Sequence, residues 1–327
     1  MLSRLLACSW HDLTMRFFIQ TGIVVALFLV SSMVAMARER VTPDWNYAKT
    51  RMKKAGLKSS FVSVLKKSYE PDDFRDVTEL NLLLFLRKVD QHAVQVTDEA
   101  TEKVRDFMKE NREALDLAER KYQVAGPVIA SLLWMESRYG QNLGRFHVAS
   151  VFVNLLQVDR PEVIDDLKKH GSLRFSDHPS KKDLKKVAAR AKKKAKWAME
   201  ELRAVERIYR ERGEDVLEFR GSFAGAFGMP QFLPSSYSRW AKSAQTKTSS
   251  PKLNKPDDAI HSVANYLKLN GWREKRKKTH VVALMNYNNS RDYANAILKL
   301  AKKVTAVHGL ASTPKVEAAS IKEDSDN

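Results

Sequence analysis

Apolar and polar residues alternate with helical spacing along most of the chain. Thr97, followed by two acidic residues, is typical of a helix start, and the apolar positions after it repeat mainly every three or four residues. Gly126-Pro127 predicts the end of that helix and the start of another, because proline fits the first turn of a helix. The next segment, residues 128–138, is almost wholly apolar and should end at Gly140.

The same spacing predicts further helices on both sides of this region. They are residues 44–69, interrupted at Gly56, residues 181–208 with one apolar stripe, residues 257–269 and residues 282–304. Strand signals are few, apart from a small hairpin expected near residues 219–223. The predicted fold class is therefore all-α.

An uncharged apolar run, residues 17–37, follows Arg16 and ends in Ala35-Met36-Ala37. This layout predicts a signal peptide over residues 1–37, with cleavage after Ala37 and a periplasmic location for the rest. The alternative is an uncleaved membrane anchor, because the run is long enough to span a bilayer. Cys8 is the one cysteine, so the exported part has no disulfide.

The chain carries 57 Lys and Arg against 39 Asp and Glu, a formal charge of +18. Such an excess favours an anionic partner, and export argues against nucleic acid. A cell-wall glycan with carboxylates on its peptides fits both observations. Residues 181–196 hold nine basic residues and one acid and predict a solvated helix. That helix could grip an anionic polymer or be only an exposed face, and the sequence leaves both interpretations open.

Glu136 lies late in the apolar segment 128–138. Burial and proximity to a helix C-terminus both disfavour a carboxylate, so both raise its pKa. A general acid that works near neutral pH needs such a pKa. The alternative is a glutamate at a helix end that faces solvent.

Two further stretches suit the recognition of sugars. Residues 221–237 contain three glycines, two prolines and four aromatic residues, which is typical of a loop that lines a groove. Residues 286–293 are polar and aromatic and lie between two apolar helical segments. Asparagine amides there can donate to and accept from a substrate N-acetyl group.

Together these stretches resemble the membrane-bound lytic transglycosylase B family (glycoside hydrolase family 103) of peptidoglycan-cleaving enzymes. The resemblance covers most of residues 44–305 and is carried by Glu136-Ser137-Arg138-Tyr139-Gly140, residues 221–237, Asp258-Ala259-Ile260, Gly271-Trp272 and Tyr287-Asn288-Asn289-Ser290. It implies a lysozyme-like helical catalytic core over residues 123–308, with a Lys-rich insertion at about 176–196. An additional helical region, residues 38–122, would precede the core, and a disordered tail, residues 309–327, would follow it.

The resemblance also implies an activity and a set of site residues. The activity is cleavage of the β-1,4 bond between N-acetylmuramic acid and N-acetylglucosamine, which leaves 1,6-anhydromuramic ends. Glu136 would be the single acid/base. The substrate-binding residues implied are Ser222 and Gln231 in the pocket, Tyr266 as a sugar-stacking aromatic, and Asn288 and Tyr293 near the N-acetyl group. A hydrolytic muramidase of the same fold and a non-catalytic peptidoglycan-binding protein are the alternatives.

One departure from the family pattern concerns calcium. Members of the family often carry a calcium loop before the helix that begins near Asp258, but here residues 241–256 contain no Asp or Glu. Because calcium needs several hard oxygen ligands, we predict no metal site and no other cofactor. The expected partner is the peptidoglycan glycan strand, and no nucleic acid is expected. We expect a monomer, with membrane attachment only if residues 17–37 are retained.

Overall fold

The computed structural model describes residues 40–87, 96–245 and 250–306. The chain divides into two units, Met1–Thr42 and Pro43–Asn327, and the helices and strands described below all lie in the second. The predicted leader, residues 1–37, and the predicted disordered tail, residues 309–327, lie outside the described residues. No described helix combines the length and the apolar character needed to cross a membrane.

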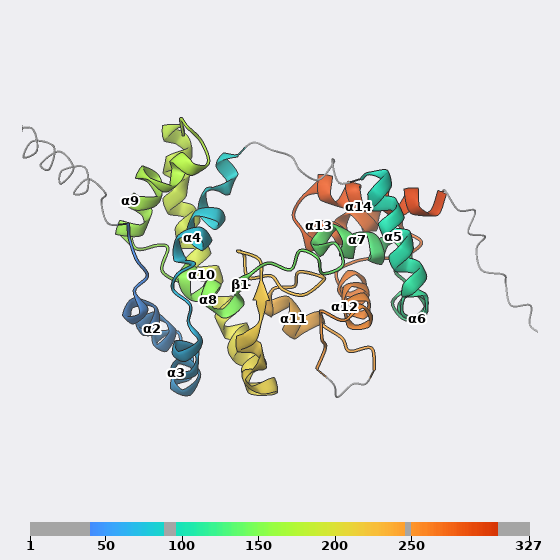
Figure 1. Ribbon diagram of the computed structural model, residues 1–327, viewed down its shortest axis with the longest axis horizontal. Coiled ribbons are helices and arrows are strands. Elements are labelled where there is room, and N and C mark those ends of the chain that lie inside the picture. Colours follow the sequence, from blue (N-terminus) through green and yellow to red (C-terminus); the bar gives the residue numbers. More distant parts are fainter. Residues whose placement is uncertain (1–39, 88–95, 246–249, 307–327) are drawn as a thin grey trace, which may run out of the picture. The chain divides into compact units, whose positions relative to one another are not determined.

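The fold is almost entirely helical, as predicted (Figure 1). The α-helices are α2 (Trp45–Lys54), α3 (Ser59–Ser68), α4 (Phe74–Leu83), α5 (Asp98–Glu110), α6 (Arg112–Tyr122), α7 (Gly126–Ser137), α8 (Val148–Leu155), α9 (Pro161–Lys169), α10 (Lys181–Arg212), α11 (Pro234–Trp240), α12 (Pro256–Leu269), α13 (Lys277–Tyr287) and α14 (Arg291–Ala306). Short 3-10 turns are η1 (Leu84–Leu86), η3 (Gly171–Arg174) and η4 (Gly213–Glu218), and the strands are β1 (Phe146–His147) and β2 (Arg220–Gly221).

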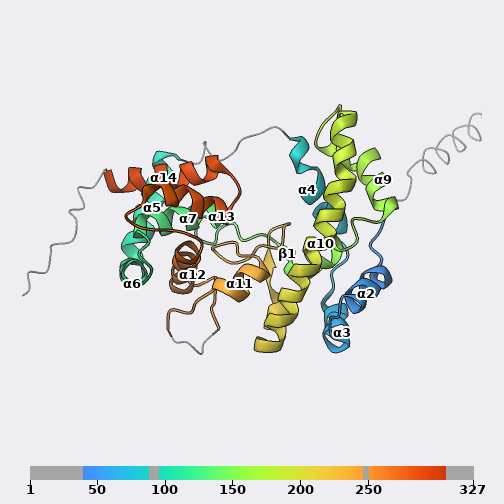
Figure 2. The same ribbon diagram turned by 180° about the vertical axis from the view of Figure 1, so that it is seen from behind.

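The most apolar helix, α7, is surrounded by other helices. It packs against α14, α5, α12 and α6, and both views show α5, α7 and α14 side by side (Figures 1 and 2). Ile129, Leu132 and Leu133 of α7 are fully buried. The long helix α10 instead packs against α8, α9, α4 and α11. An apolar helix buried on every side forms a core, and its C-terminal end is fixed by all of its neighbours.

The helix predicted to run on from Thr97 is two helices, and the prediction of one was wrong. Thr97 caps α5 as expected, because its Oγ1 accepts a hydrogen bond from the Ala100 amide at 3.0 Å. The chain bends at Asn111, whose side-chain amide donates to the Phe107 carbonyl at 2.9 Å. The bend lets α5 pack on α7 and α14 while α6 packs mainly on α12.

A short strand, β2, lies within the region where a small hairpin was expected, residues 219–223, but its main partner lies outside that region. β2 pairs antiparallel with β1, which lies more than seventy residues earlier, in the register Phe146↔Gly221 and His147↔Arg220. Phe227 forms a further isolated bridge with Gly221. The strand therefore ties the loop after α7 to the glycine-rich segment.

The long helix predicted from residue 181 is α10, and its single apolar stripe is confirmed. The expectation that residues 181–196 are solvated holds for one face only. Val187, Ala191 and Ala195 are fully buried, whereas Lys185, Lys192 and their lysine neighbours on the outer face are exposed. Alanine and valine at this spacing allow the basic segment to pack closely on the helices beside it.

The loop before α12 is held by a carboxylate. Asp258, in the first turn of α12 and almost fully buried, accepts hydrogen bonds from the Ala244 amide at 2.7 Å and the Lys252 amide at 2.6 Å. One side chain therefore joins two points of the loop that lie eight residues apart. Within the described parts of the chain, no group of three or more His, Cys, Asp or Glu is arranged to hold a metal ion.

Replacement of Asp258 by Asn should lower the free energy of unfolding by about 1–3 kcal/mol, because an amide nitrogen cannot accept from a buried backbone N–H. Asp257→Asn is the matched control. Its carboxylate also lies in the first turn of α12, so it should lose at most about 1 kcal/mol of helix-dipole stabilisation. Chemical denaturation of both variants measures the difference. Equal losses would show that the loop does not depend on Asp258.

Candidate active site

The end of α7 places Glu136 where two left-handed residues turn the chain. Arg138 and Tyr139 have φ of 49° and 57°, so the helix ends sharply after Ser137. Tyr139 is held in this conformation by a stacked contact with Phe107, whose ring centroid lies 3.9 Å away, and its hydroxyl donates to the Ala130 carbonyl at 3.1 Å. Packing therefore offsets the cost of the unusual backbone and fixes the last turn of α7.

Glu136 keeps partial contact with solvent while protein atoms surround its carboxyl group. Its Oε1 accepts a hydrogen bond from the Tyr293 hydroxyl of α14. Burial raises the pKa of Glu136 to about 7, and the hydrogen bond from Tyr293 opposes this rise because it favours the carboxylate. A carboxyl group with this pKa is populated in both protonation states near neutral pH.

Aromatic residues from four segments form a cluster, and one of them, Tyr287, interacts electrostatically with Glu136. The Tyr287 ring lies 4.7 Å from that of Tyr266, and the Trp240 ring lies 4.5 Å from Tyr266 on another side. Phe232 of the glycine-rich segment contacts both tyrosines. Tyr266 donates to the Asn286 carbonyl at 2.6 Å, which joins α12 to α13. Burial raises the pKa of Tyr287 and of Tyr293, so both hydroxyls stay protonated and able to donate.

The glycine-rich segment is tied to the end of α7 through Ser137. The buried Ser137 hydroxyl donates to the Met229 carbonyl at 2.8 Å, and the Met229 amide donates to the Leu253 carbonyl at 3.0 Å. Gly225, with φ of +79°, lies against Phe152, where an added Cβ would come within 2.3 Å of the ring. Only glycine allows this close approach. The contact with Phe152 therefore positions the segment against α8, and the Ser137 hydrogen bond positions it against α7.

The structure joins two of the predicted site residues directly, Glu136 and Tyr293, and places Tyr266 in the neighbouring aromatic cluster. Gln231, with φ of 48°, donates its side-chain amide to the carbonyls of Leu143 and Gly228, so it holds the loop.

The Ser222 hydroxyl accepts from the Ala226 amide at 3.3 Å. Asn288 is exposed, and its backbone caps α13. No hydrogen bond links Ser222, Gln231 or Asn288 to Glu136 in the described part of the chain.

Comparison with known proteins identifies the family. The model of the transglycosylase SLT domain family matches residues 41–284, most of the chain. The chain belongs to the transglycosylase SLT domain family. Membrane-bound lytic murein transglycosylase B of Escherichia coli is 28% identical over 166 residues, which are 51% of this chain and 37% of that protein. The alignment thus spans little more than a third of the relative's length.

Solved structures share the fold of this SLT domain. The soluble lytic transglycosylase SltB1 of Pseudomonas aeruginosa aligns with a TM-score of 0.61 and 19% identity, over 81% of this chain and 99% of that one. SltB3 of the same organism, solved in complex with NAG-anhNAM-pentapeptide, aligns with a TM-score of 0.58 and 16% identity, over 80% of this chain and 78% of that one. The resemblance to the lytic transglycosylase B family and the lysozyme-like fold are thereby confirmed.

Sequence reasoning did not select Tyr287 or Ser137 as site residues of this SLT domain. The Tyr287 hydroxyl donates to the Pro230 carbonyl, and its ring contacts both Phe232 and Tyr266. Tyr287 precedes Asn288 in the motif, and Ser137 directly follows Glu136, so position in the motifs was the available signal. Which backbone carbonyl each side chain reaches depends on the fold.

The Lys-rich helix of this SLT domain also approaches the glycine-rich segment. Lys194 lies over the Trp197 ring at 4.0 Å, and the Trp197 ring contacts the edge of Phe152, on which Gly225 packs. Burial, together with the nearby Arg190, lowers the pKa of Lys194 to about 8. Lys194 therefore differs from the exposed lysines of α10, and neutralising it would disturb packing as well as charge.

The raised pKa of Glu136 predicts how stability changes with pH. Between its ordinary pKa of 4.5 and about 7, the folded chain binds the proton more tightly than the unfolded chain, so this contribution is present at low pH and lost as pH rises through 7. Glu136→Gln has no titratable group at this position, so its stability lacks this pH-dependent contribution. Its free energy of unfolding, relative to the unmodified protein, should therefore rise by about 1–3 kcal/mol between pH 4 and pH 8.

Urea denaturation across this pH range measures the difference, with Glu102→Gln on the exposed face of α5 as the control. Parallel curves for Glu136→Gln and the unmodified protein would mean that Glu136 titrates like an exposed carboxyl group.

Proposed function

We propose that the chain is a lytic transglycosylase that acts on the glycan strands of peptidoglycan in the periplasm. Membership of the SLT domain family and the similarity to the E. coli enzyme support this activity. The bond cleaved is the β-1,4 bond between N-acetylmuramic acid and N-acetylglucosamine, and the product carries a 1,6-anhydromuramic end. The observation that carries the proposal is Glu136, a carboxyl group with a pKa of about 7 beside buried tyrosines.

The environment of Glu136 suits a mechanism with one carboxyl group. Ordinary glycosidases use two carboxyl groups on opposite sides of the scissile bond. Here the pKa of Glu136 is set by burial and by Tyr293, neither of which is a second carboxyl group. The role of the missing nucleophile falls to the substrate, because the N-acetyl oxygen of muramic acid can stabilise the positive charge at its own anomeric carbon.

The reaction then needs one group that gives a proton and takes one back. Protonated Glu136 donates to the glycosidic oxygen as the bond to the anomeric carbon breaks, which leaves a carboxylate. The carboxylate takes the proton from the C6 hydroxyl as that oxygen attacks the anomeric carbon and closes the anhydro ring. The C6 hydroxyl belongs to the same sugar, so its effective concentration lets it outcompete water.

The surrounding side chains have supporting parts in this proposal. Tyr293 orients Glu136 and stabilises its carboxylate between the two proton transfers. Asn288, exposed next to Tyr287, is available to hold the N-acetyl group. Tyr266 would stack on a sugar, and the loop that Gln231 and Ser222 stabilise would form the wall of the groove.

Glu136→Gln should lower the rate of peptidoglycan cleavage by about 10²–10⁴-fold, because an amide can neither donate nor accept the catalytic proton. The measurement is release of muropeptides from purified sacculi, with mass spectrometry of the products of the unmodified protein. Anhydro ends are one water lighter than hydrolytic ends. Glu102→Gln, on the exposed face of α5, should cleave at the normal rate.

Three results would contradict the proposal. Cleavage by Glu136→Gln at the rate of the unmodified protein would remove Glu136 from the mechanism. Hydrated products from the unmodified protein would assign the chain to hydrolytic muramidases of the same fold. Sacculus binding with no released product would instead indicate a non-catalytic peptidoglycan-binding protein.

The exposed face of α10 predicts a separate effect on binding to the wall. Lys182, Lys185, Lys192 and Lys193 are exposed, and such charges attract an anionic polymer over a Debye length of about 8–10 Å. Changing all four to Gln should weaken pelleting with insoluble peptidoglycan at low salt and flatten its salt dependence, while turnover of short soluble fragments stays normal.

The matched control changes four exposed lysines on other elements to Gln, namely Lys103, Lys109, Lys278 and Lys299. It has the same net charge as the α10 variant. Equal pelleting by the two variants would mean that only net charge matters and that α10 is simply a solvated face.

A further inference from the structure

A pocket whose lining includes none of the predicted site residues lies along the C-terminal half of α10. Its volume is about 430 Å³, and it is bounded by α10, α11 and the turn between α2 and α3. Both views show this part of α10 between α3 and α11 (Figures 1 and 2). Four arginines line what we call the arginine pocket, namely Arg203, Arg207 and Arg210 of α10 and Arg239 of α11.

The two carboxylates of the arginine pocket already have partners. Glu200 accepts a hydrogen bond from Arg203 at 2.6 Å, and Glu206 accepts from the Lys58 backbone amide at 2.7 Å. Arg203 also donates to the Ala55 carbonyl at 3.1 Å. The contacts to Lys58 and Ala55 hold the turn between α2 and α3 against α10. Arg203, Glu200 and Glu206 therefore have structural parts in the wall of the pocket.

The other three arginines have no anionic partner. Among the described residues, Arg207, Arg210 and Arg239 form no ion pair, and all three are exposed. Arg207 lies four positions after Arg203 and three before Arg210, and like charges this close on a helix lower its stability. Four arginines against two glutamates leave the lining with a net charge of +2. An anion in the pocket would reduce this repulsion and break no existing ion pair.

The buried Glu201 fixes α11 against α10 beside the pocket. Glu201 is only 3% exposed, and its carboxylate accepts from the Ser235 amide at 2.9 Å and from the Ser235 hydroxyl at 2.8 Å. Arg239 attracts the same carboxylate, which opposes the rise in the pKa of Glu201 that burial causes. The helices that carry the arginines are therefore held in place before any ligand binds, which lowers the cost of binding.

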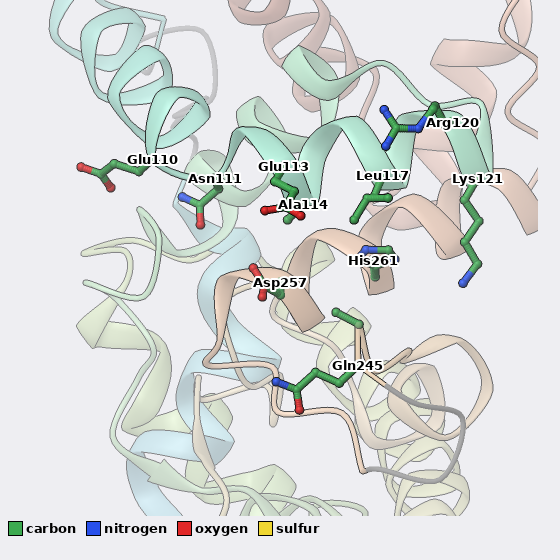
Figure 3. Close-up of a pocket in the computed structure, with 11 residues that line it drawn as sticks. Glu110, Asn111, Glu113, Ala114, Leu117, Arg120, Lys121, Gln245, Asp257 and His261 are labelled. Carbon is green, nitrogen blue, oxygen red and sulfur yellow. The ribbon is translucent and has the colours of Figure 1, made fainter.

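A larger pocket, of about 700 Å³ between α6 and α12, has a different distribution of charge (Figure 3). Glu110, Glu113 and Asp257 lie toward one end of it, and Arg120 and Lys121 lie toward the other. Charges of both signs select no single class of ion. In the arginine pocket the charged groups without an ion pair are all cations, so that pocket selects an anion.

We propose that the arginine pocket binds a phosphate group. A guanidinium group donates two parallel hydrogen bonds to two oxygens of a phosphate. The oxygens of a phosphate point in four directions, so Arg207, Arg210 and Arg239 can bind one phosphate from different sides. A carboxylate has only two oxygens in one plane. The phosphate belongs to a soluble phosphate ester or to the headgroup of an anionic phospholipid, which share this chemistry. The inference is independent of the proposed function.

Calorimetric titration with inorganic phosphate tests the site. Arg207→Gln with Arg210→Gln should weaken phosphate binding by about tenfold to a hundredfold, because it removes charge-assisted hydrogen bonds. Arg207→Lys with Arg210→Lys keeps the charge but lacks the planar fork, so it should weaken binding less. Neither side chain forms an ion pair among the described residues, so both variants should melt at the temperature of the unmodified protein.

The charge-matched control is Arg120→Gln with Arg276→Gln, two exposed arginines on other parts of the chain. It should bind phosphate like the unmodified protein. No phosphate binding by the unmodified protein, or an equal loss in the control, would overturn the proposal. Both double Gln variants should cleave sacculi at the rate of the unmodified protein, so failure of this inference is separate from failure of the proposed function.

A second titration tests whether the site prefers phosphate to carboxylates. Succinate has two negative charges, both on carboxylates like those of the cell wall. At equal ionic strength it should bind at least about tenfold more weakly than phosphate, because it cannot present three oxygens on one centre. Equal binding of succinate would make the pocket a site for any dianion and would overturn the assignment to phosphate.

Two further probes distinguish the sources of the phosphate. If glycerol 3-phosphate binds and vesicles of phosphatidylglycerol do not, the ligand is a soluble phosphate ester. If the vesicles bind the unmodified protein and the Arg120→Gln, Arg276→Gln control but not Arg207→Gln with Arg210→Gln, the ligand is a lipid headgroup. Binding of neither probe would overturn the proposal, and so would vesicle binding that both double variants weaken equally.

Discussion

The burial of α7 is the constraint on which the rest of the structure depends. A helix this apolar must be covered on every side, and α5, α6, α12 and α14 cover it. That packing brings Tyr293 to Glu136 across 157 positions of sequence. It also fixes Ser137, through which the glycine-rich segment is anchored. The hydrophobic effect that builds the core therefore determines the geometry of the candidate site.

Periodicity predicted most helices, because burial of one face leaves a signal in the sequence. The bend at Asn111 escaped prediction, since the side-chain hydrogen bond to Phe107 that stabilises it competes locally with a pattern that favours continuation. The partner of β2 escaped for a different reason: two-residue strands carry almost no periodic signal, and β1 lies far away in sequence. Glu136 was identifiable because a lone carboxyl group in an apolar helix is unusual.

The other predicted site residues show that a motif identifies residues but not the contacts that they make. Ser222, Gln231 and Asn288 could be selected by resemblance, but their contacts could not, and the structure gives Gln231 a part in holding the loop. The contacts of Asp258 were likewise not predictable from the sequence. The absence of acids in residues 241–256 was visible in the sequence. That a carboxylate from the next helix bonds the loop at Ala244 and Lys252 became visible only in the fold.

Glu136 lies near the C-terminal end of α7 and Tyr293 near the N-terminal end of α14, and these two ends affect the energy of a nearby charge in opposite ways. Glu136 is in the last turn of α7, where the aligned carbonyl groups favour a neutral acid, while Tyr293 is in the first turn of α14, where the amide groups favour negative charge. At the carboxyl group itself, burial favours the neutral acid and the hydrogen bond from Tyr293 favours the carboxylate, so two effects oppose each other there. Neither protonation state is then much lower in energy than the other, so a proton can leave Glu136 and return to it without a large uphill step in either direction.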